Sequence, residues 1–341
     1  NTGLNSQLQA ISGGGNVGIG TTTPQSRFEV WTGATTTSLI HFRWSNNVWV
    51  WLGASRTAQT GNANSAFGNE SLYSVTNGYS NTAMWYRSLR STTIGYNNSA
   101  FWQETLYSNA WWTWNTALWY QALYSNTSWA RNIGIWPQAL NNLTTGNDNI
   151  AIGYQAARVI AGSSVSNNIA IWTNTLNSAT VWNLIAVGYQ ALYSNAWGAG
   201  NQWVGYQALY SNTSGNYNVA NWYEALLLNS TASNNIAIGY QALRTNSTSS
   251  NNTAVWFQSL YANTAASNTA MGSYSLRSNT TGWSNTAFWQ EALYGNTTWA
   301  NNVAVGLQTL DSNSTWWENV AVWKGAMGNI GTAPQNNTMM G

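Results

Sequence analysis

The residues that could carry out chemistry are few and scattered along the chain. There is one histidine, His41, and no cysteine, so the sequence offers no thiolate metal site, no zinc site and no Ser–His–Asp constellation. Glycoside hydrolysis needs two neighbouring carboxylates, and the acidic residues are spread over the whole chain. They are Glu29, Glu70, Glu104, Asp148, Glu224, Glu291, Asp311 and Glu318. We therefore expect no catalytic residue, no metal site and no enzyme.

Four of these acids occupy one position of a repeated sequence unit. They are Glu70, Glu104, Glu224 and Glu291, and most other units have glutamine there. Strands of successive units would lie about 4.8 Å apart, so even Glu70 and Glu104, two units apart, would be separated by roughly 10 Å. Glutamate that replaces glutamine on a solvated face is the better interpretation.

The composition excludes several classes of protein. Only 5% of the residues are charged and the net charge of +2 is spread along the chain, which gives no basic face for nucleic acid. Hydrophobic residues make up 44%, too many for a disordered chain. No apolar run is long enough for a membrane helix. The loop Gly15–Gly20 loosely resembles a phosphate loop, but it lacks the Rossmann spacing and a following helix pattern, so we expect no cofactor.

A repeat of mostly 17 residues fills the chain from Ala66 onward. Each unit contains an anchor, which is a small residue in all units but one, then an apolar residue, and a leucine six residues after the anchor. The exceptions are Trp203 at an anchor, Asn221 at the apolar position, and Ala157 and Met327 at the leucine position. The anchors of the sixteen units are Ala66, Ala83, Ala100, Ala117, Gly134, Ala151, Ala170, Ala186, Trp203, Ala220, Ala237, Ala254, Ala270, Ala287, Ala304 and Ala321. The units end in turns rich in Asn, Ser, Thr and Gly, which disfavour helix interiors.

These patterns predict an all-β fold, a β-solenoid or β-roll of about sixteen coils with one unit per coil. Anchors and leucines should point inward and stack in register, while the turns face water. A coil this short encloses little core, which favours several chains packed side by side or intertwined. We expect a glycine-rich head or connector over residues 1–30, a transitional β segment over 31–65, the solenoid over 66–328 and a tail over 329–341. Within the head, the sequence predicts a short helix over Leu4–Ile11 and two strands within Gly13–Val30, and Thr35–Trp51 is β-prone.

Two stretches carry a resemblance to known families. The segment NVGIGTTTPQSRFEV (residues 16–30), followed by repeats such as VGYQALYSNTSGN, resembles the repeat region of phage tail fibres. The core AIG, as at Ala151–Gly153, is similar to the β-roll head of trimeric autotransporter adhesins, although the period differs. Both resemblances imply homotrimers at a cell surface or in a virion, outside the cell.

The second residue after each anchor is either glycine or tryptophan and never anything else. We call it the diagnostic position. It is occupied by Gly68, Trp85, Trp102, Trp119, Trp136, Gly153, Trp172, Gly188, Gly205, Trp222, Gly239, Trp256, Gly272, Trp289, Gly306 and Trp323. Packing does not select only the smallest and the largest side chain. Some bacterial lineages and their phages read the codon UGA as glycine, so our hypothesis is that many of these tryptophans are glycine in the living protein. The alternative is a genuine tryptophan ladder on a glycan-binding face.

Tyrosines recur directly after the diagnostic position, at Tyr154, Tyr189, Tyr206 and Tyr240, and form a candidate surface aromatic ladder that could pack between chains or stack on sugars. Glycosylation sequons such as Asn126–Ser128 and Asn212–Ser214 are explained by turn chemistry. The sequence thus favours a structural fibre segment that spaces or presents a receptor-binding region. Its expected partner is itself, as a homotrimer, without nucleic acid and without membrane insertion. The alternatives are an adhesin that binds host-surface glycans through its repeat face, and the subunit of a self-assembling extracellular filament.

Overall fold

The computed structural model describes the backbone of the strands within residues 1–50, and then residues 61–109, 111, 113–127, 131–160, 165–312, 317–328 and 337–340. The chain divides into two compact units, Asn1–Ser166 and Asn167–Gly341. Every element in the described residues is a strand. No helix there is long and apolar enough to cross a membrane.

The first unit begins with strands of mixed direction and continues as a parallel stack. Antiparallel pairings join β1 to β2, β3 to β4 and β4 to β5, while β2 and β3 are parallel. From β5 to β11 each strand pairs in parallel with the next one along the chain, and the short strand β12 lies outside this stack. The strands are β1 (Leu8–Ala10), β2 (Val17–Ile19), β3 (Phe28–Trp31), β4 (Ser38–Phe42), β5 (Val48–Val50), β6 (Ser65–Phe67), β7 (Thr82–Met84), β8 (Ser99–Phe101), β9 (Thr116–Leu118), β10 (Ile133–Ile135), β11 (Ile150–Ile152) and β12 (Val159–Ile160).

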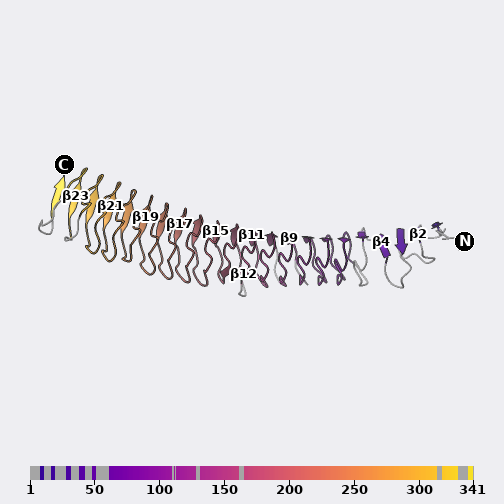
Figure 1. Cartoon of the computed structure of the whole chain (residues 1–341). Coiled ribbons are helices and arrows are strands. Elements are labelled where there is room, and N and C mark those ends of the chain that lie inside the picture. The colour runs from indigo at the N-terminus through magenta and orange to yellow at the C-terminus, as the bar shows by residue number, and fades with distance from the viewer. Residues whose placement is uncertain are drawn as a thin grey trace. The chain divides into compact units, whose positions relative to one another are not determined.

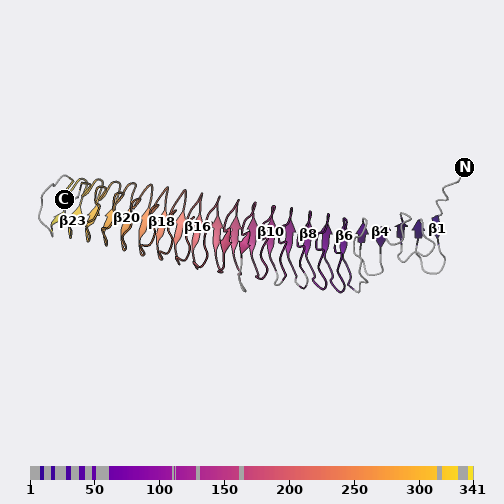
Figure 2. The same cartoon turned by 60° about the horizontal axis from the view of Figure 1, so that its bottom comes forward.

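The second unit is a parallel stack from β13 to β24, with the short strand β14 outside it. Figures 1 and 2 show its strands side by side, each followed by a loop that leads to the next. The strands are β13 (Ile169–Ile171), β14 (Ser178–Ala179), β15 (Ile185–Val187), β16 (Gln202–Val204), β17 (Val219–Asn221), β18 (Ile236–Ile238), β19 (Thr253–Val255), β20 (Thr269–Met271), β21 (Thr286–Phe288), β22 (Val303–Val305), β23 (Val320–Val322) and β24 (Thr338–Met340).

Each unit is therefore a β-solenoid, as the repeat predicts. Anchors pair with anchors in register, for example Ala220 with Ala237 and Ala237 with Ala254. Side chains alternate across a strand, so the anchor points inward while its two strand neighbours point outward. The anchors and the leucines six residues later, such as Leu209 and Leu226, are fully buried. The predicted inward ladders are confirmed.

The coils turn through backbone with positive φ. Three positions per coil, namely three residues before the anchor and four and six residues after it, have φ between 47° and 64° wherever they are not glycine. The buried leucine is one of them, as at Leu209 with φ of 53°. Such left-handed residues reverse the chain sharply, which lets a 17-residue unit close around a core of small side chains.

Buried asparagines form two further ladders inside the coils. In the first, two residues before the anchor, the backbone N–H of most asparagines donates to the side-chain oxygen of the asparagine one coil earlier, as Asn132 does to Asn115 at 3.0 Å. The side-chain amide then donates to a turn carbonyl, as Asn132 does to Gly146 at 2.7 Å. Leu184 takes the place of asparagine in one coil, and its N–H donates to Asn168. In the second ladder, Asn212 donates to Asn195 at 2.6 Å. These hydrogen bonds satisfy polar groups that the solenoid has removed from water.

In the N-terminal segment, one predicted element is wrong and the predicted strands are present. The predicted helix over Leu4–Ile11 is wrong, because Leu8–Ala10 is a strand paired antiparallel with Val17–Ile19. Sheet pairing outweighs the weak helix preference of so short a segment. The two strands expected within Gly13–Val30 and the β-prone stretch Thr35–Trp51 are confirmed by β2 to β5. His41 lies in β4, and its side chain is outside the described residues.

Candidate interaction surface

The outward face of each solenoid carries a continuous apolar stripe. We call it the outer apolar stripe and define it as the residues directly after the anchors. In the first unit these are Phe67, Met84, Phe101, Leu118, Ile135 and Ile152; in the second they are Ile171, Val187, Val204, Ile238, Val255, Met271, Phe288, Val305 and Val322, with Asn221 as the polar exception. Several are more than a third exposed, including Val204 at 47% and Ile238 at 40%. Parallel sheets normally have both faces covered, so this stripe lacks a partner within its unit.

The diagnostic position lies beside this stripe, at the residue after it. Glycines there have φ between 133° and 152°, and tryptophans there have φ between 80° and 130°. All nine tryptophans are 40–67% exposed. A bulky L-residue in this region is strained by roughly 1–2 kcal/mol. Every diagnostic residue thus lies in a backbone conformation that suits glycine.

Four of these tryptophans in the first unit form one stack. The ring centroids of Trp85 and Trp102 are 5.2 Å apart, those of Trp102 and Trp119 4.9 Å, and those of Trp119 and Trp136 6.0 Å, with nearly parallel planes. A sugar that binds an aromatic residue covers the face of its ring. Because the faces in this stack are covered by neighbouring rings, mainly ring edges remain for a ligand.

Tyrosines directly after the diagnostic position stack into a column in the second unit. Tyr189, Tyr206 and Tyr240 stack in one column together with Tyr223 and Phe257, with centroid spacings of 5.0–5.3 Å. Tyr154 belongs to the first unit and is 45% exposed. The predicted ladder has glycine before each tyrosine, and it omits Tyr223 and Phe257 because tryptophan precedes both.

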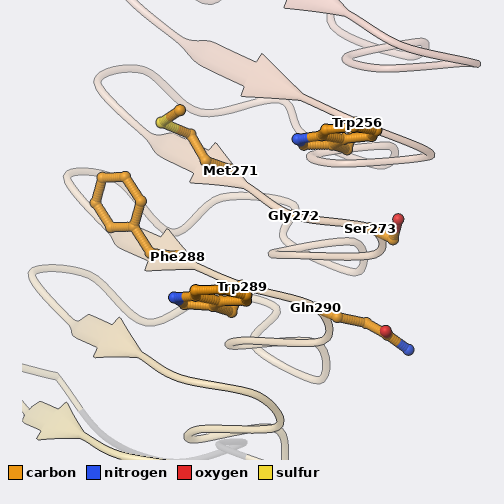
Figure 3. Close-up of a pocket in the computed structure, with 7 residues that line it drawn as sticks. All are labelled: Trp256, Met271, Gly272, Ser273, Phe288, Trp289 and Gln290. Carbon is orange, nitrogen blue, oxygen red and sulfur yellow. The ribbon is translucent and has the colours of Figure 1, made fainter.

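In the second unit, tryptophan and glycine alternate from Trp222 to Trp323, and this alternation hollows the surface. Figure 3 shows the indoles of Trp256 and Trp289 facing each other across Gly272. The open hollow between them has a volume of about 490 Å³, and Met271, Ser273, Phe288 and Gln290 also line it. Two coils separate the indoles by roughly 10 Å, which leaves room for one ring-shaped ligand.

Four of the acidic residues, Glu70, Glu104, Glu224 and Glu291, belong to a column of glutamine and glutamate. Gln241 donates to Glu224 at 2.9 Å and Gln121 donates to Glu104 at 2.9 Å. Gln308 donates to Glu291 at 2.8 Å. The interpretation of glutamate as a substitute for glutamine is supported by these contacts.

Arginines neutralise two of the carboxylates in this column. Glu70 accepts hydrogen bonds from Arg90 and Arg87, both at 2.8 Å. The bond from Arg90 is the largest cause of the lowered pKa of Glu70; burial opposes it, and Arg87 adds to it. Burial acts most strongly on the pKa of Glu224 and raises it, but the bonds from Arg244 and Gln241 together outweigh burial, so this pKa is lowered too. Carboxylates held ionised in this way are poor general acids.

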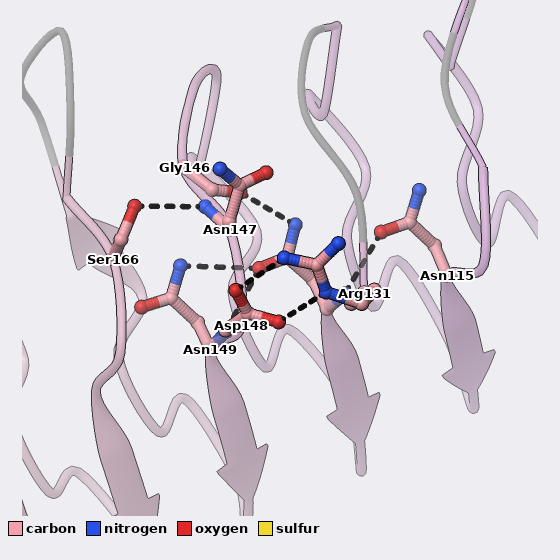
Figure 4. A network of polar contacts seen from close by, with 8 residues as sticks. Asn115, Arg131, Gly146, Asn147, Asp148, Asn149 and Ser166 are labelled. Carbon is pink, nitrogen blue, oxygen red and sulfur yellow. Dashed lines mark hydrogen bonds and ion pairs between the residues drawn. The ribbon is translucent and has the colours of Figure 1, made fainter.

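Asp148 forms a further ion pair in the first unit, on the turn side of the coil. Its carboxylate accepts two hydrogen bonds from Arg131, at 2.5 and 2.7 Å (Figure 4). These bonds lower the pKa of Asp148. Within the described residues, no three His, Asp or Glu side chains gather into a group that could hold a metal ion.

The sequon asparagines are structural. Asn126 and Asn212 are fully buried, and the amide of Asn212 donates to Asn195 and to the carbonyl of Gly215. An enzyme that attaches a glycan needs an accessible amide, so the turn-chemistry interpretation is supported, with these asparagines buried inside the coil.

Comparison with models of protein families, with curated protein sequences and with solved structures finds no match to this chain.

Proposed function

We propose that this chain is a structural segment of an extracellular or virion fibre, similar to a phage tail fibre, which spaces or presents a receptor-binding region. The observation that carries the proposal is the repetition of one coil with in-register ladders in each unit. Each coil adds about 4.8 Å, so the ten anchor strands of the second unit extend on the order of 45 Å. Such a stack supplies length and stiffness, and the column of glutamines and glutamates offers no catalytic pair.

Self-association is part of the proposal. The outer apolar stripe repeats at the strand spacing, and a second copy of the chain presents the same stripe at the same spacing. The apolar side chains of two chains can therefore contact each other along the whole stripe only when both chains repeat at the same strand spacing. With 5% charged residues, copies side by side also meet little charge repulsion. A homotrimer, as the resemblance implies, would cover this face in each copy.

Sedimentation of the purified full-length chain, together with negative-stain microscopy, tests this proposal. We expect rods with three times the mass of one chain. A monomer at every concentration would contradict self-association. Rods that grow end to end with concentration would support the filament alternative instead.

One observation favours the adhesin alternative. The hollow between Trp256 and Trp289 presents two indole faces that no neighbouring ring covers. A screen of immobilised glycans with the full-length chain tests this function. Binding that the variant Trp289→Ala abolishes, but that Tyr206→Ala leaves intact, would support glycan binding at the hollow. Absence of binding to every glycan would argue against it.

A further inference from the structure

The diagnostic position is the one position of the repeat whose φ is recurrently 80° or more; outside it, only Gly146 among the described residues has such a φ, at 149°. Three other positions in each coil also have positive φ, and where they are not glycine their φ lies between 47° and 64°. This is the ordinary left-handed region, which L-residues can enter. These positions accept leucine, glutamine, glutamate, asparagine, arginine and tyrosine, for example Leu209, Gln207 and Arg131. Positive φ alone therefore does not restrict the residue type in this fold.

The diagnostic position lies beyond that region. Its glycines reach φ of 133° to 152°, where backbone without a Cβ is required. The nine tryptophans are displaced to lower φ, between 80° and 130°, and none reaches the 47°–64° range of the other three positions. The tryptophans thus have positive φ as the glycines do, but they do not reach the φ of the glycines.

The neighbouring coil gives an independent reason for glycine. A Cβ placed on Gly68 would lie 2.6 Å from the backbone carbonyl carbon of Trp85, one coil further on, and a Cβ on Gly306 would lie 2.6 Å from that of Trp323. At Gly188, Gly205, Gly239 and Gly272 the nearest atoms are also backbone atoms of the next coil, at less than 3.0 Å. This backbone directly follows a strand and is hydrogen-bonded to the previous coil, as the N–H of Trp85 is to the carbonyl of Phe67 at 2.6 Å, so it cannot move aside as a flexible side chain can. A side chain at this position therefore requires the neighbouring backbone to shift. Turn glycines such as Gly215 are as close to the next coil, yet Ala232 occupies the same turn position one coil later, so the φ of the diagnostic position is the stronger constraint.

From these two constraints we infer that all nine diagnostic tryptophans are UGA codons, which the cell of origin reads as glycine. UGA differs from the glycine codon GGA by one base and is read as tryptophan in some other codes. A cell with a glycine tRNA for UGA would produce the pattern of glycine or tryptophan, and nothing else, when its gene is translated with the wrong table. This inference does not depend on the proposed fibre function.

The same reasoning extends to Trp203, the one tryptophan at a described anchor of the sixteen repeat units. Its side chain is buried among alanine ladders, and its indole N–H has no hydrogen-bond partner. Gly134 occupies the equivalent anchor of another coil, which shows that glycine fits there. Trp182, Trp197 and Trp283 are different, because they are exposed, have no positive φ and occupy turn positions where several residue types occur. The geometry demands glycine at the nine diagnostic positions, suits a small residue such as alanine or glycine at residue 203, and is indifferent at Trp182, Trp197 and Trp283.

Under this inference the native surface has no tryptophan stack and no hollow at Gly272. The groove along the diagnostic position is then continuous bare backbone, bordered by the outer apolar stripe on one side and the tyrosine column on the other. The adhesin alternative at the hollow fails if the inference holds, whereas the fibre proposal is unaffected.

The direct test is the gene together with the protein from its native source. We expect UGA at all nine diagnostic codons, and peptides such as Ala117–Leu123 with the mass of glycine at residue 119. Tryptophan mass at this position, or UGG codons at the nine positions, would overturn the inference.

A second test needs only recombinant protein. The full-length chain is made with tryptophan, with glycine and with alanine at all nine positions, and thermal unfolding is followed by circular dichroism. We expect the glycine chain to unfold at a clearly higher temperature than the other two, or to be the one that folds. Alanine removes the indole but keeps the Cβ, so an alanine chain as stable as the glycine chain would refute the demand for glycine. Glycine at Trp182, Trp197 and Trp283 is the matched control and should give no increase.

Discussion

Glu224 shows how one charged side chain is accommodated in an almost uncharged coil. Its carboxylate accepts hydrogen bonds from Arg244 at 2.7 Å and from Gln241 at 2.9 Å, and its side chain is only 12% exposed. Gln241 and Gln258 continue the same column without charge. The ion pair is therefore an addition to a ladder that glutamine can build alone.

We predict that Glu224→Gln lowers stability at neutral pH and has no effect in acid. The pKa of Glu224 is lower in the folded chain than its ordinary value of 4.5. Its contribution is therefore complete above the unfolded pKa and is lost as the pH falls through the lower folded pKa. At pH 7 we expect a loss of about 0.5–1 kcal/mol, the size of a partly exposed ion pair. Chemical denaturation of both chains at pH 7 and at pH 3 measures it.

The control for this prediction is Glu318→Gln in the same unit. Glu318 is exposed and makes no ion pair within the described part of the chain. Its substitution should leave stability unchanged at both pH values. An effect of Glu224→Gln that does not shrink as the pH falls from 7 to 3 would show that the carboxylate acts by packing and not by charge.

At the scale of the coil, the asparagine ladder is the element that makes a short unit possible. The side-chain oxygen of Asn218 accepts the backbone N–H of Asn235 at 3.0 Å, and its amide donates to the carbonyl of Ala232 at 2.8 Å. These two backbone groups lie inside the solenoid, away from water. Asparagine thus completes the hydrogen bonding where the strand ends and the turn begins.

We predict that Asn218→Ala destabilises the chain by about 2–3 kcal/mol, because it leaves a buried N–H and a buried carbonyl without partners. Asn221→Ala in the same coil is the matched control, since Asn221 is exposed on the outer face and should cost less than about 0.5 kcal/mol. Equilibrium denaturation of both variants measures the difference. Equal effects would mean that the ladder adds no more than surface asparagine does.

The sequence predicted the buried alanine and leucine ladders of the coil, but it did not predict the buried asparagine ladders. Alanine anchors and leucines are apolar residues at a fixed period, and this pattern predicts that they point into the core of every coil. The burial of Ala220 and Leu226 confirms it. A periodic asparagine is compatible with two structures, because asparagine suits exposed turns and can also hydrogen-bond to an asparagine of the next coil. The period of the sequence does not distinguish between these two structures. The left-handed conformation of Leu209 was equally hidden, since leucine rarely adopts it.

The candidate surface was predicted in part for a similar reason. Tyrosine after glycine was recognised, whereas Tyr223 and Phe257 were not, because tryptophan stands before them. Glycine at Trp222 and Trp256 would have made the column regular in the sequence. The outer apolar stripe follows from alternation along the strand, but its exposure depends on whether a second layer covers it, and only the structure shows that nothing in the same unit does.

At the scale of the molecule, the outer apolar stripe is the surface through which we propose that copies of the chain associate. We expect that the double substitution Val204→Lys and Ile238→Lys shifts the sedimenting species toward the monomer. Both residues are exposed, so the thermal unfolding of the single chain should change little. In an assembly that buries the stripe, each lysine would lose water and face the same charge on another copy.

The control places lysine at Thr231 and Thr298, which lie on exposed turns of the same unit. These lysines add equal charge away from the stripe and should leave the assembly intact. If both pairs of lysines weakened assembly equally, net charge would be the cause and the stripe would not be the interface.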